Sequence, residues 1–194
     1  MNSSVCSEEP IVEEEEMEPK QAPLPNAEGI KSFVAQSSSS FGRLVQGTFE
    51  FQTHAEAERL SAMLALNSTS PERASVGFWE LLSNAIEHGN LGIDLDLKTR
   101  LLNEGKFEEE VARRHALPEY RNRTVTAEFR SEPDRTLLKV SDEGEGFDFE
   151  DILNREMSLD RPNGRGIKLA QQFGFDRLEY LGKGNVVEGC ILGE

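Results

Sequence analysis

Apolar and polar positions alternate or recur at helical spacing over most of the chain. Residues 43 to 51 alternate between the two kinds, which predicts a strand. Thr53 and Glu56 have the spacing of a capping box, so we expect a helix to begin there. A second helix is predicted over residues 71 to 88, closed by Gly89 at its C-terminal end.

The second half of the chain contains further helical patterns and four strand patterns. Residues 91 to 122 combine dense charge with helical apolar spacing, which predicts one or two small helices. The apolar spacing over residues 166 to 173 predicts another short helix. Alternating apolar positions predict two hairpins, each with proline or glycine in its turn. The four strands of these hairpins cover residues 125 to 129, 136 to 140, 177 to 181 and 186 to 192.

Residues 1 to 40 differ from the rest of the chain in composition. Runs of glutamate and serine, together with several prolines, leave few large apolar side chains to offset the entropy cost of ordering. We expect a disordered acidic tail over residues 1 to 40 and one domain over residues 41 to 194. Residues 1 to 28 contain eight glutamates and one lysine, so they carry seven of the 15 excess negative charges. Such a tail either keeps the protein soluble or binds a partner.

The net charge and the two cysteines argue against several classes of protein. A formal net charge of −15 argues against sequence-independent nucleic-acid binding, which needs Lys and Arg to neutralise phosphates. Cys6 and Cys190 lie at opposite ends of the chain and form neither a disulfide framework nor a metal-ligand pair, which indicates a reducing compartment. The sequence contains neither a secretory signal nor an apolar run of about 18 residues. We therefore expect a cytoplasmic protein that binds neither nucleic acid nor a membrane.

The predicted helix over residues 71 to 88 carries a single polar stripe. Glu80, Asn84, Glu87 and His88 fall within about 100° of one another around the helix, and most other positions are apolar. Such a stripe either faces solvent or lines a cleft. A solvent face usually carries Lys or Arg, and this one has neither, which favours the cleft.

Two glycine-containing segments follow this helix in the sequence. The Asp142-Glu-Gly-Glu-Gly146 turn comes after an apolar strand and places a carboxylate beside residues without side chains, so a ligand can approach the backbone. The Gly164-Arg-Gly166 loop opens a helix, whose free N–H groups and dipole favour phosphate. Each segment alone is also typical of a plain turn. The polar stripe and both segments in this order are much more specific.

Together these motifs resemble the N box and the two glycine boxes of the GHKL ATPase superfamily. The anti-sigma-factor serine kinase branch is the nearer match, because the N box reads Glu-x-x-x-Asn-Ala-x-x-His-Gly and the Gly-Arg-Gly-Ile loop is short. The resemblance covers the chain from about residue 43 to its end. It implies the Bergerat ATP-binding fold, an α+β two-layer sandwich with a mixed, mainly antiparallel sheet and helices packed on one face.

The resemblance also implies ATP and Mg²⁺ as cofactors and assigns roles to individual residues. Asn84 would coordinate Mg²⁺, and Asp142 would accept a hydrogen bond from the adenine amino group. Glu80 would act as the general base that takes a proton from an attacking serine hydroxyl or water. The other implied nucleotide contacts belong to the glycine boxes: Gly144, Gly146, Gly164, Arg165 and Gly166.

Two functions follow from the resemblance. The first is an ATP-dependent serine-protein kinase that phosphorylates a STAS-type antagonist and alternatively sequesters a sigma factor; dimerisation is suggested by that branch alone. The second is a non-catalytic nucleotide-binding module that controls a partner by binding. Intact Glu80 favours the first, whereas residues 91 to 122, an insertion that compact anti-sigma kinases lack, favour the second. We expect a structural role for His88 and a surface position for His54 and His115.

Overall fold

A computed structural model describes residues 29, 30, 32, 34, 42–147 and 170–193. Its centre is a five-stranded open sheet in the order β1-β2-β3-β5-β4, and all four strand pairs run antiparallel. The prediction of a mixed sheet was therefore wrong for the described residues. The tight turns after β2 and β4 permit only antiparallel pairing, but no pattern in the sequence set the direction of the other two pairs. The strands are β1 (Gln46–Phe51), β2 (Val125–Ser131), β3 (Arg135–Ser141), β4 (Arg177–Leu181) and β5 (Val186–Leu192).

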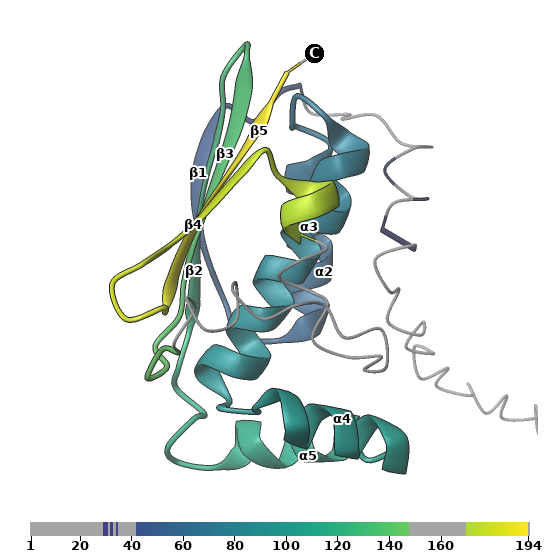
Figure 1. Ribbon diagram of the computed structural model, residues 1–194, viewed down its shortest axis with the longest axis vertical. Helices are drawn as coiled ribbons and strands as arrows, with labels where there is room; N and C mark the ends of the chain where they lie inside the picture. The colour runs from purple at the N-terminus through teal and green to yellow at the C-terminus, as the bar shows by residue number, and fades with distance from the viewer. Residues whose placement is uncertain (1–28, 31, 33, 35–41, 148–169, 194) are drawn as a thin grey trace, which may run out of the picture.

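Helices cover one face of this sheet (Figure 1). α2 begins at the predicted capping box, in which the Thr53 side chain accepts from the Glu56 N–H and the Glu56 carboxylate accepts from the Thr53 N–H. α2 packs beside α3, and α3 packs against η2. The helical elements are α2 (His54–Ala65), α3 (Pro71–Asn84), η1 (Ala85–Asn90), α4 (Leu95–Glu104), α5 (Phe107–Ala116) and η2 (Ala170–Gly174).

The core lies between α3 and the inner face of the sheet. Phe78 of α3 is fully buried and packs edge-on against Phe129 of β2, and the centroid of the Phe175 ring lies 5.9 Å from that of Phe78. Burial of an aromatic side chain of this size contributes about 2–3 kcal/mol. Two glycines make room for Phe175, since a Cβ at Gly77 would come within 2.7 Å of its ring and a Cβ at Gly189 would overlap it.

The core also extends into the segment that the sequence assigns to the acidic tail. Ile30 and Val34 are 2% and 4% exposed and belong to the same cluster of buried residues as α2 and α3. Their spacing of four residues places both on one face of a helical turn. These two side chains therefore contribute to the domain although they precede residue 41.

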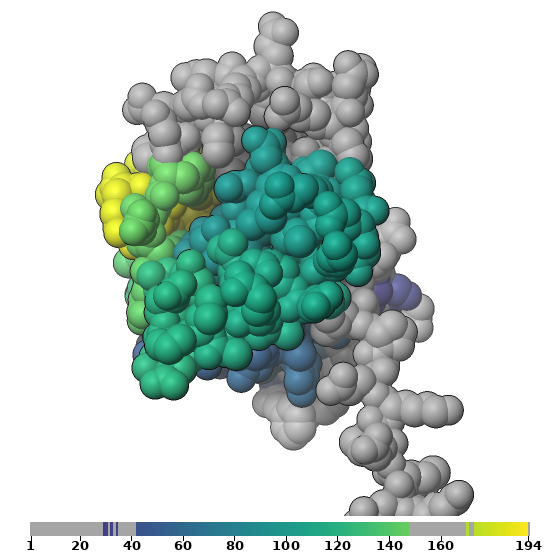
Figure 2. All heavy atoms as spheres, turned by 90° about the horizontal axis from the view of Figure 1, so that it is seen from below, coloured from purple at the N-terminus to yellow at the C-terminus, as the bar shows by residue number. Residues whose placement is uncertain are grey.

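The predicted insertion forms α4 and α5, as the helical spacing of residues 91 to 122 indicated. Asp94 caps α4 by accepting from the Leu97 N–H at 2.7 Å, and Gly105 ends it in the left-handed conformation, with φ 67°. Figure 2 shows this end of the molecule, where α4 and α5 form the central part of the described surface. Across the described residues, none of the helices has the length and apolar character that crossing a membrane requires.

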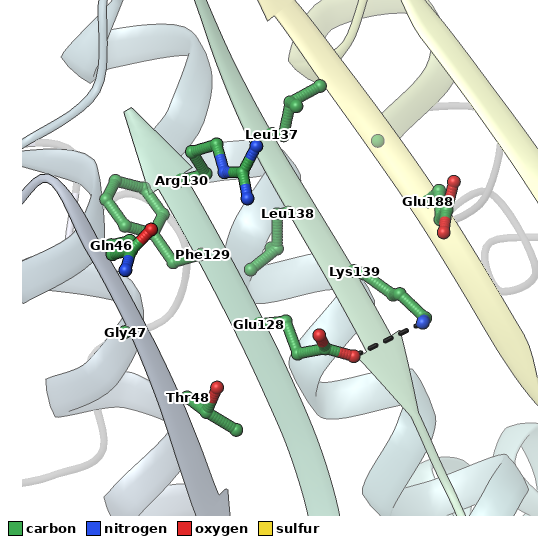
Figure 3. A pocket seen from close by; sticks show the side chains of 11 residues that line it. Gln46, Gly47, Thr48, Glu128, Phe129, Arg130, Leu137, Leu138, Lys139 and Glu188 are labelled. Atoms are coloured by element: carbon green, nitrogen blue, oxygen red, sulfur yellow. Dashed lines mark ion pairs between the residues drawn. The ribbon is translucent and has the colours of Figure 1, made fainter. Parts of the chain in front are cut away.

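Among the described residues, no helix lies on the other face of the sheet, and polar side chains are numerous there. Outward-facing side chains from β1, β2, β3 and β5 line a shallow hollow there, shown in Figure 3 with the ion pair between Lys139 and Glu128 at 3.2 Å. Alternation of polar outward and apolar inward positions is typical of an antiparallel sheet packed on one side. None of the predicted site residues that the structure describes lines this hollow.

Candidate functional site

We call α3 together with its continuation η1 the site helix. The C-terminal end of this helix contacts the Asp142 turn, which follows β3. η1 continues α3, the helix that carries Glu80 and Asn84, and its Gly89 packs against Asp142. A Cβ at Gly89 would lie 2.5 Å from the Asp142 Oδ1, and a Cβ at Gly144 would overlap the Gly89 carbonyl. The fold thus brings together two of the three motifs that the sequence singled out.

The C-terminal end of this helix differs from the prediction. The chain changes from α-helix to π-helix at Ala85 and continues to Asn90, beyond the expected end at His88. Gly89 has no left-handed φ, and the glycine that does is Gly92, with φ 61°. Gly89 is therefore not a helix-ending glycine. Its missing side chain is explained by the close approach of Asp142, which only the tertiary structure reveals.

Asn90 is a link that the sequence reasoning missed. Its side chain is 3% exposed, and its Oδ1 accepts a hydrogen bond from the Glu143 N–H at 2.8 Å. Its Nδ2 is buried without a hydrogen-bond partner among the described residues. The Asn90 carbonyl accepts from Arg123 at 2.9 Å. The only signal in the sequence was an asparagine directly after Gly89, and that position alone does not specify this hydrogen bond.

Asp142 is held rigidly at the start of its turn. Its backbone N–H donates to the Asn185 carbonyl at 3.0 Å, and its own carbonyl accepts from the Asn185 side chain at 3.1 Å. Its Oδ1 accepts from the Gly144 N–H at 2.8 Å. Burial raises the pKa of Asp142 to about 6, against the hydrogen bond from Gly144 and the charges of Lys183 and Arg123, which lower it. The carboxylate is therefore largely ionised above neutral pH and able to accept a further hydrogen bond.

The glycines of this turn are also required by packing within the protein. Gly146 has φ 81°, and a Cβ there would overlap the Lys183 carbonyl in the turn of the last hairpin. That carbonyl accepts from the Phe147 N–H at 2.9 Å, while the Lys183 ammonium donates to the Gly144 carbonyl at 2.8 Å. The β4–β5 turn thereby fixes the shape of the Asp142 turn.

Glu80 and Asn84 lie one turn apart on α3, and both are half-buried. Neither side chain makes a hydrogen bond or ion pair with another described residue. Burial raises the pKa of Glu80; the charge of Lys98 lowers it and that of Glu87 raises it further. These two polar groups are therefore available to a ligand.

Two predictions about Glu87 and His54 were wrong, because both side chains are buried and pair with each other. Glu87 is 4% exposed and does not line a cleft, because its carboxylate pairs with His54 at 2.9 Å and with Lys98 of α4. Burial works against the charged form of Glu87, but the hydrogen bond from His54 and the charge of Lys98 outweigh it and lower its pKa. His54 is 9% exposed, so its predicted surface position was wrong. The insertion covers both residues, and the stripe alone does not predict how it packs.

His88 has the structural role that we expected. Its Nδ1 is hydrogen-bonded with the carbonyl of Ile93, directly after the helix. Burial lowers its pKa, with the charge of Glu87 opposing this effect, so the ring is neutral at physiological pH.

The insertion is anchored to the end of the site helix. Arg114 of α5 donates to the carbonyls of Leu91 and Gly92, the latter at 2.9 Å. The guanidinium groups of Arg114 and Arg123 lie 5.8 and 5.0 Å from the ring centre of Tyr120. The segment also contacts the rest of the domain through the ion pair of Lys98 with Glu87 and the packing of Phe107 against His54, so residues 91 to 122 are an integral part of the domain.

The second glycine box, Gly164, Arg165 and Gly166, lies outside the described residues. Most of the predicted helix over residues 166 to 173 does so too, and its described part is η2. The described residues contain no group of three or more His, Cys, Asp and Glu side chains that could hold a metal ion. A Mg²⁺ ion bound through a nucleotide needs few protein ligands, and the unpaired amide oxygen of Asn84 is the kind of ligand that it accepts.

Comparison with protein-family models and with curated proteins finds no match for this chain. The fold that is established is an α+β arrangement of an antiparallel sheet with helices on one face.

Proposed function

We propose that this chain is an ATP-binding regulatory protein of the GHKL type with a Bergerat fold. One observation carries the proposal: the helix with the unpaired Glu80 and Asn84 ends, at Gly89, directly against the half-buried carboxylate of Asp142. The sequence motifs that resemble the N box and the first glycine box are thus neighbours in space, as a shared nucleotide site requires.

A nucleotide would lie along the exposed side of α3 and η1. Glu80 and Gly89 are separated by nine residues, or roughly 13 Å at about 1.5 Å per residue. The adenine would bind at the Asp142 end, where the carboxylate accepts a hydrogen bond from the amino group. Asn84 would hold Mg²⁺ against the phosphates midway, and the terminal phosphate would point toward Glu80.

In this arrangement Glu80 is the general base for phosphate transfer. Its partial burial raises its pKa, which makes it a better proton acceptor than an exposed glutamate as long as it remains ionised. The proposed reaction transfers the γ-phosphate to a serine of a STAS-type antagonist. A sigma factor would be the alternative partner, and the resemblance to the anti-sigma branch suggests a homodimer.

A second function is favoured by the packing of the insertion. Lys98 of α4 pairs with Glu87 of the site helix, and Arg114 of α5 donates to the Leu91 carbonyl directly after it, features that the compact anti-sigma kinases do not explain. If these contacts serve only to order the surface around a bound nucleotide, the protein controls its partner by binding and transfers no phosphate.

Phosphate transfer separates the two functions. The protein is incubated with labelled ATP, Mg²⁺ and candidate STAS proteins, and wild type is compared with Glu80→Gln. We expect transfer by wild type and a loss of at least about 100-fold in the variant, since general bases contribute about 10²–10⁴-fold, with ATP binding retained. Absence of transfer by wild type to any STAS protein, together with intact ATP binding, would leave only the binding module.

A further inference from the structure

Lys98 comes from the insertion but contacts the site helix. Its ammonium pairs with the carboxylate of Glu87, which follows Glu80 by seven residues. Because the chain is π-helical from Ala85 on, Glu87 lies roughly two turns beyond Glu80, toward the Asp142 end of the helix. Lys98 contacts the helix at Glu87, and its charge also acts on the proposed general base, Glu80.

A buried cluster fixes the position of this ammonium. The other oxygen of the Glu87 carboxylate pairs with the His54 Nε2 at 2.9 Å, and the His54 ring contacts Trp79 and Phe107 at centroid distances of 6.3 and 6.4 Å. The Phe107 ring also lies 5.7 Å from the Lys98 Nζ. Groups from α2, α3, η1 and α5 thus hold the lysine before any ligand binds, which reduces the entropy cost of using it.

The Lys98 ammonium has N–H donors that the described residues do not engage. The Lys98 side chain is 23% exposed, against 6% for Glu87. An ammonium has three N–H donors, and Glu87 is the acceptor that Lys98 meets among the described residues. The remaining donors can therefore reach an anionic oxygen at the surface of the cluster.

The charges around the site create a need for such a cation. Glu80, Glu87 and Asp142 are carboxylates, and each repels the polyphosphate of a nucleotide. The charge of Lys98 reaches Glu80, since it counteracts the rise that burial causes in the Glu80 pKa. In the proposed arrangement the terminal phosphate lies at the Glu80 end. Lys98 is thus placed to offset repulsion where the last phosphate adds most negative charge.

We propose that Lys98 binds the terminal phosphate of the nucleotide, so that the α4–α5 insertion makes the site select a nucleoside triphosphate over a diphosphate. This inference rests on the proposed nucleotide site and adds to it a binding residue from outside the three motifs. The insertion then has a direct role in ligand recognition.

Calorimetric titration with Mg²⁺ and either ATP or ADP tests this role. Lys98→Met should weaken ATP binding by at least about tenfold and ADP binding by less than about threefold, because a hydrogen bond to a charged group is lost only with ATP. Lys98→Arg should retain most of the preference for ATP. Lys106→Met is the matched control, because Lys106 is an exposed lysine between α4 and α5 that pairs with Glu104, and it should leave both affinities unchanged.

Loss of the ammonium also leaves Glu87 buried without one of its partners, so thermal unfolding is measured in parallel. The double variant Glu87→Gln/Lys98→Met removes both charges and should show the same selective loss of ATP binding. Equal weakening of ATP and ADP in both variants would overturn the inference in favour of a purely structural ion pair.

Failure of the inference is distinguishable from failure of the nucleotide site. If wild type binds ATP and ADP and Lys98→Met keeps the wild-type ratio of affinities, the role of Lys98 is overturned and the site stands. If wild type binds neither nucleotide, both are overturned.

Discussion

At the residue scale, the partly buried position of Asp142 disfavours the ionised form of its carboxyl group. Its backbone and its Oδ1 are fully engaged, yet burial raises its pKa to about 6. A carboxylate at the surface of a plain turn would not need this arrangement. Positions where burial opposes the charged form are typical of functional sites, because stability is given up there for chemistry.

The cost of this charge predicts that Asp142→Asn stabilises the protein. A folded-state pKa of about 6, above the usual 3.8, means that the carboxyl contributes most to stability below pH 3.8 and that this contribution is lost as the pH rises through 6. The asparagine oxygen can still accept from Gly144. We expect a gain of roughly 1–2 kcal/mol in the free energy of unfolding at pH 8, after discounting for solvent screening.

Urea unfolding of both proteins at pH 8 and pH 4 measures this gain. The difference between variant and wild type should be much smaller at pH 4, since the Asp142 carboxyl is then protonated in the folded state and partly protonated in the unfolded state. Equal differences at the two pH values would show that the charge of Asp142 carries no penalty.

At the element scale, the elements that local signals determine were predicted well. The capping box of α2, the hairpins β2–β3 and β4–β5, and the two helices of the insertion follow from spacing and turn residues near in sequence. The end of the site helix was not predictable in this way. Its continuation as η1 and the packing of Gly89 depend on the turn at Asp142, 53 residues further along the chain.

This contact predicts that Gly89→Ala affects binding as well as stability. The new Cβ would displace Asp142, so we expect a loss of about 1–3 kcal/mol from overpacking together with weaker ATP binding. Gly105→Ala is the matched control: its φ of 67° is strained for alanine, but no atom lies within 4 Å of the new Cβ. It should lose about 1 kcal/mol and bind ATP as wild type does.

Urea unfolding and ATP titration of both variants test the claim. If Gly89→Ala is less stable but binds ATP with wild-type affinity, the contact between Gly89 and Asp142 is not part of the nucleotide site.

At the scale of the whole molecule, the insertion determines which polar residues remain available. The sequence predicted one polar stripe of Glu80, Asn84, Glu87 and His88 that lines a cleft, but Glu87 is buried, and long-range packing decides the role of each residue. α4 buries Glu87 and supplies Lys98, whereas Glu80 and Asn84 remain half-exposed and unpaired. Periodicity shows which side chains share a face, not which segment covers it.

Long-range packing also decides the pairing of β1 with β2 and the burial of two residues before position 41. The pairing of β1 with β2 joins segments separated by more than 70 residues, and no pattern in either strand specifies it. Ile30 and Val34 stand in a stretch whose composition resembles a tail, yet both are buried. Two well-spaced apolar residues are enough to join a core, and average composition conceals them.

Binding of Mg·ATP, measured by isothermal titration calorimetry, tests the central claim most directly. The account predicts that wild type binds at pH 7.5 and more weakly at pH 5, because protonation of Asp142 near pH 6 removes the acceptor for the adenine amino group. Asp142→Asn should bind at least about tenfold more weakly, since its amide donor would face another donor, and should lose most of this pH dependence. Absence of binding by wild type, or an unchanged affinity in Asp142→Asn, would contradict the account.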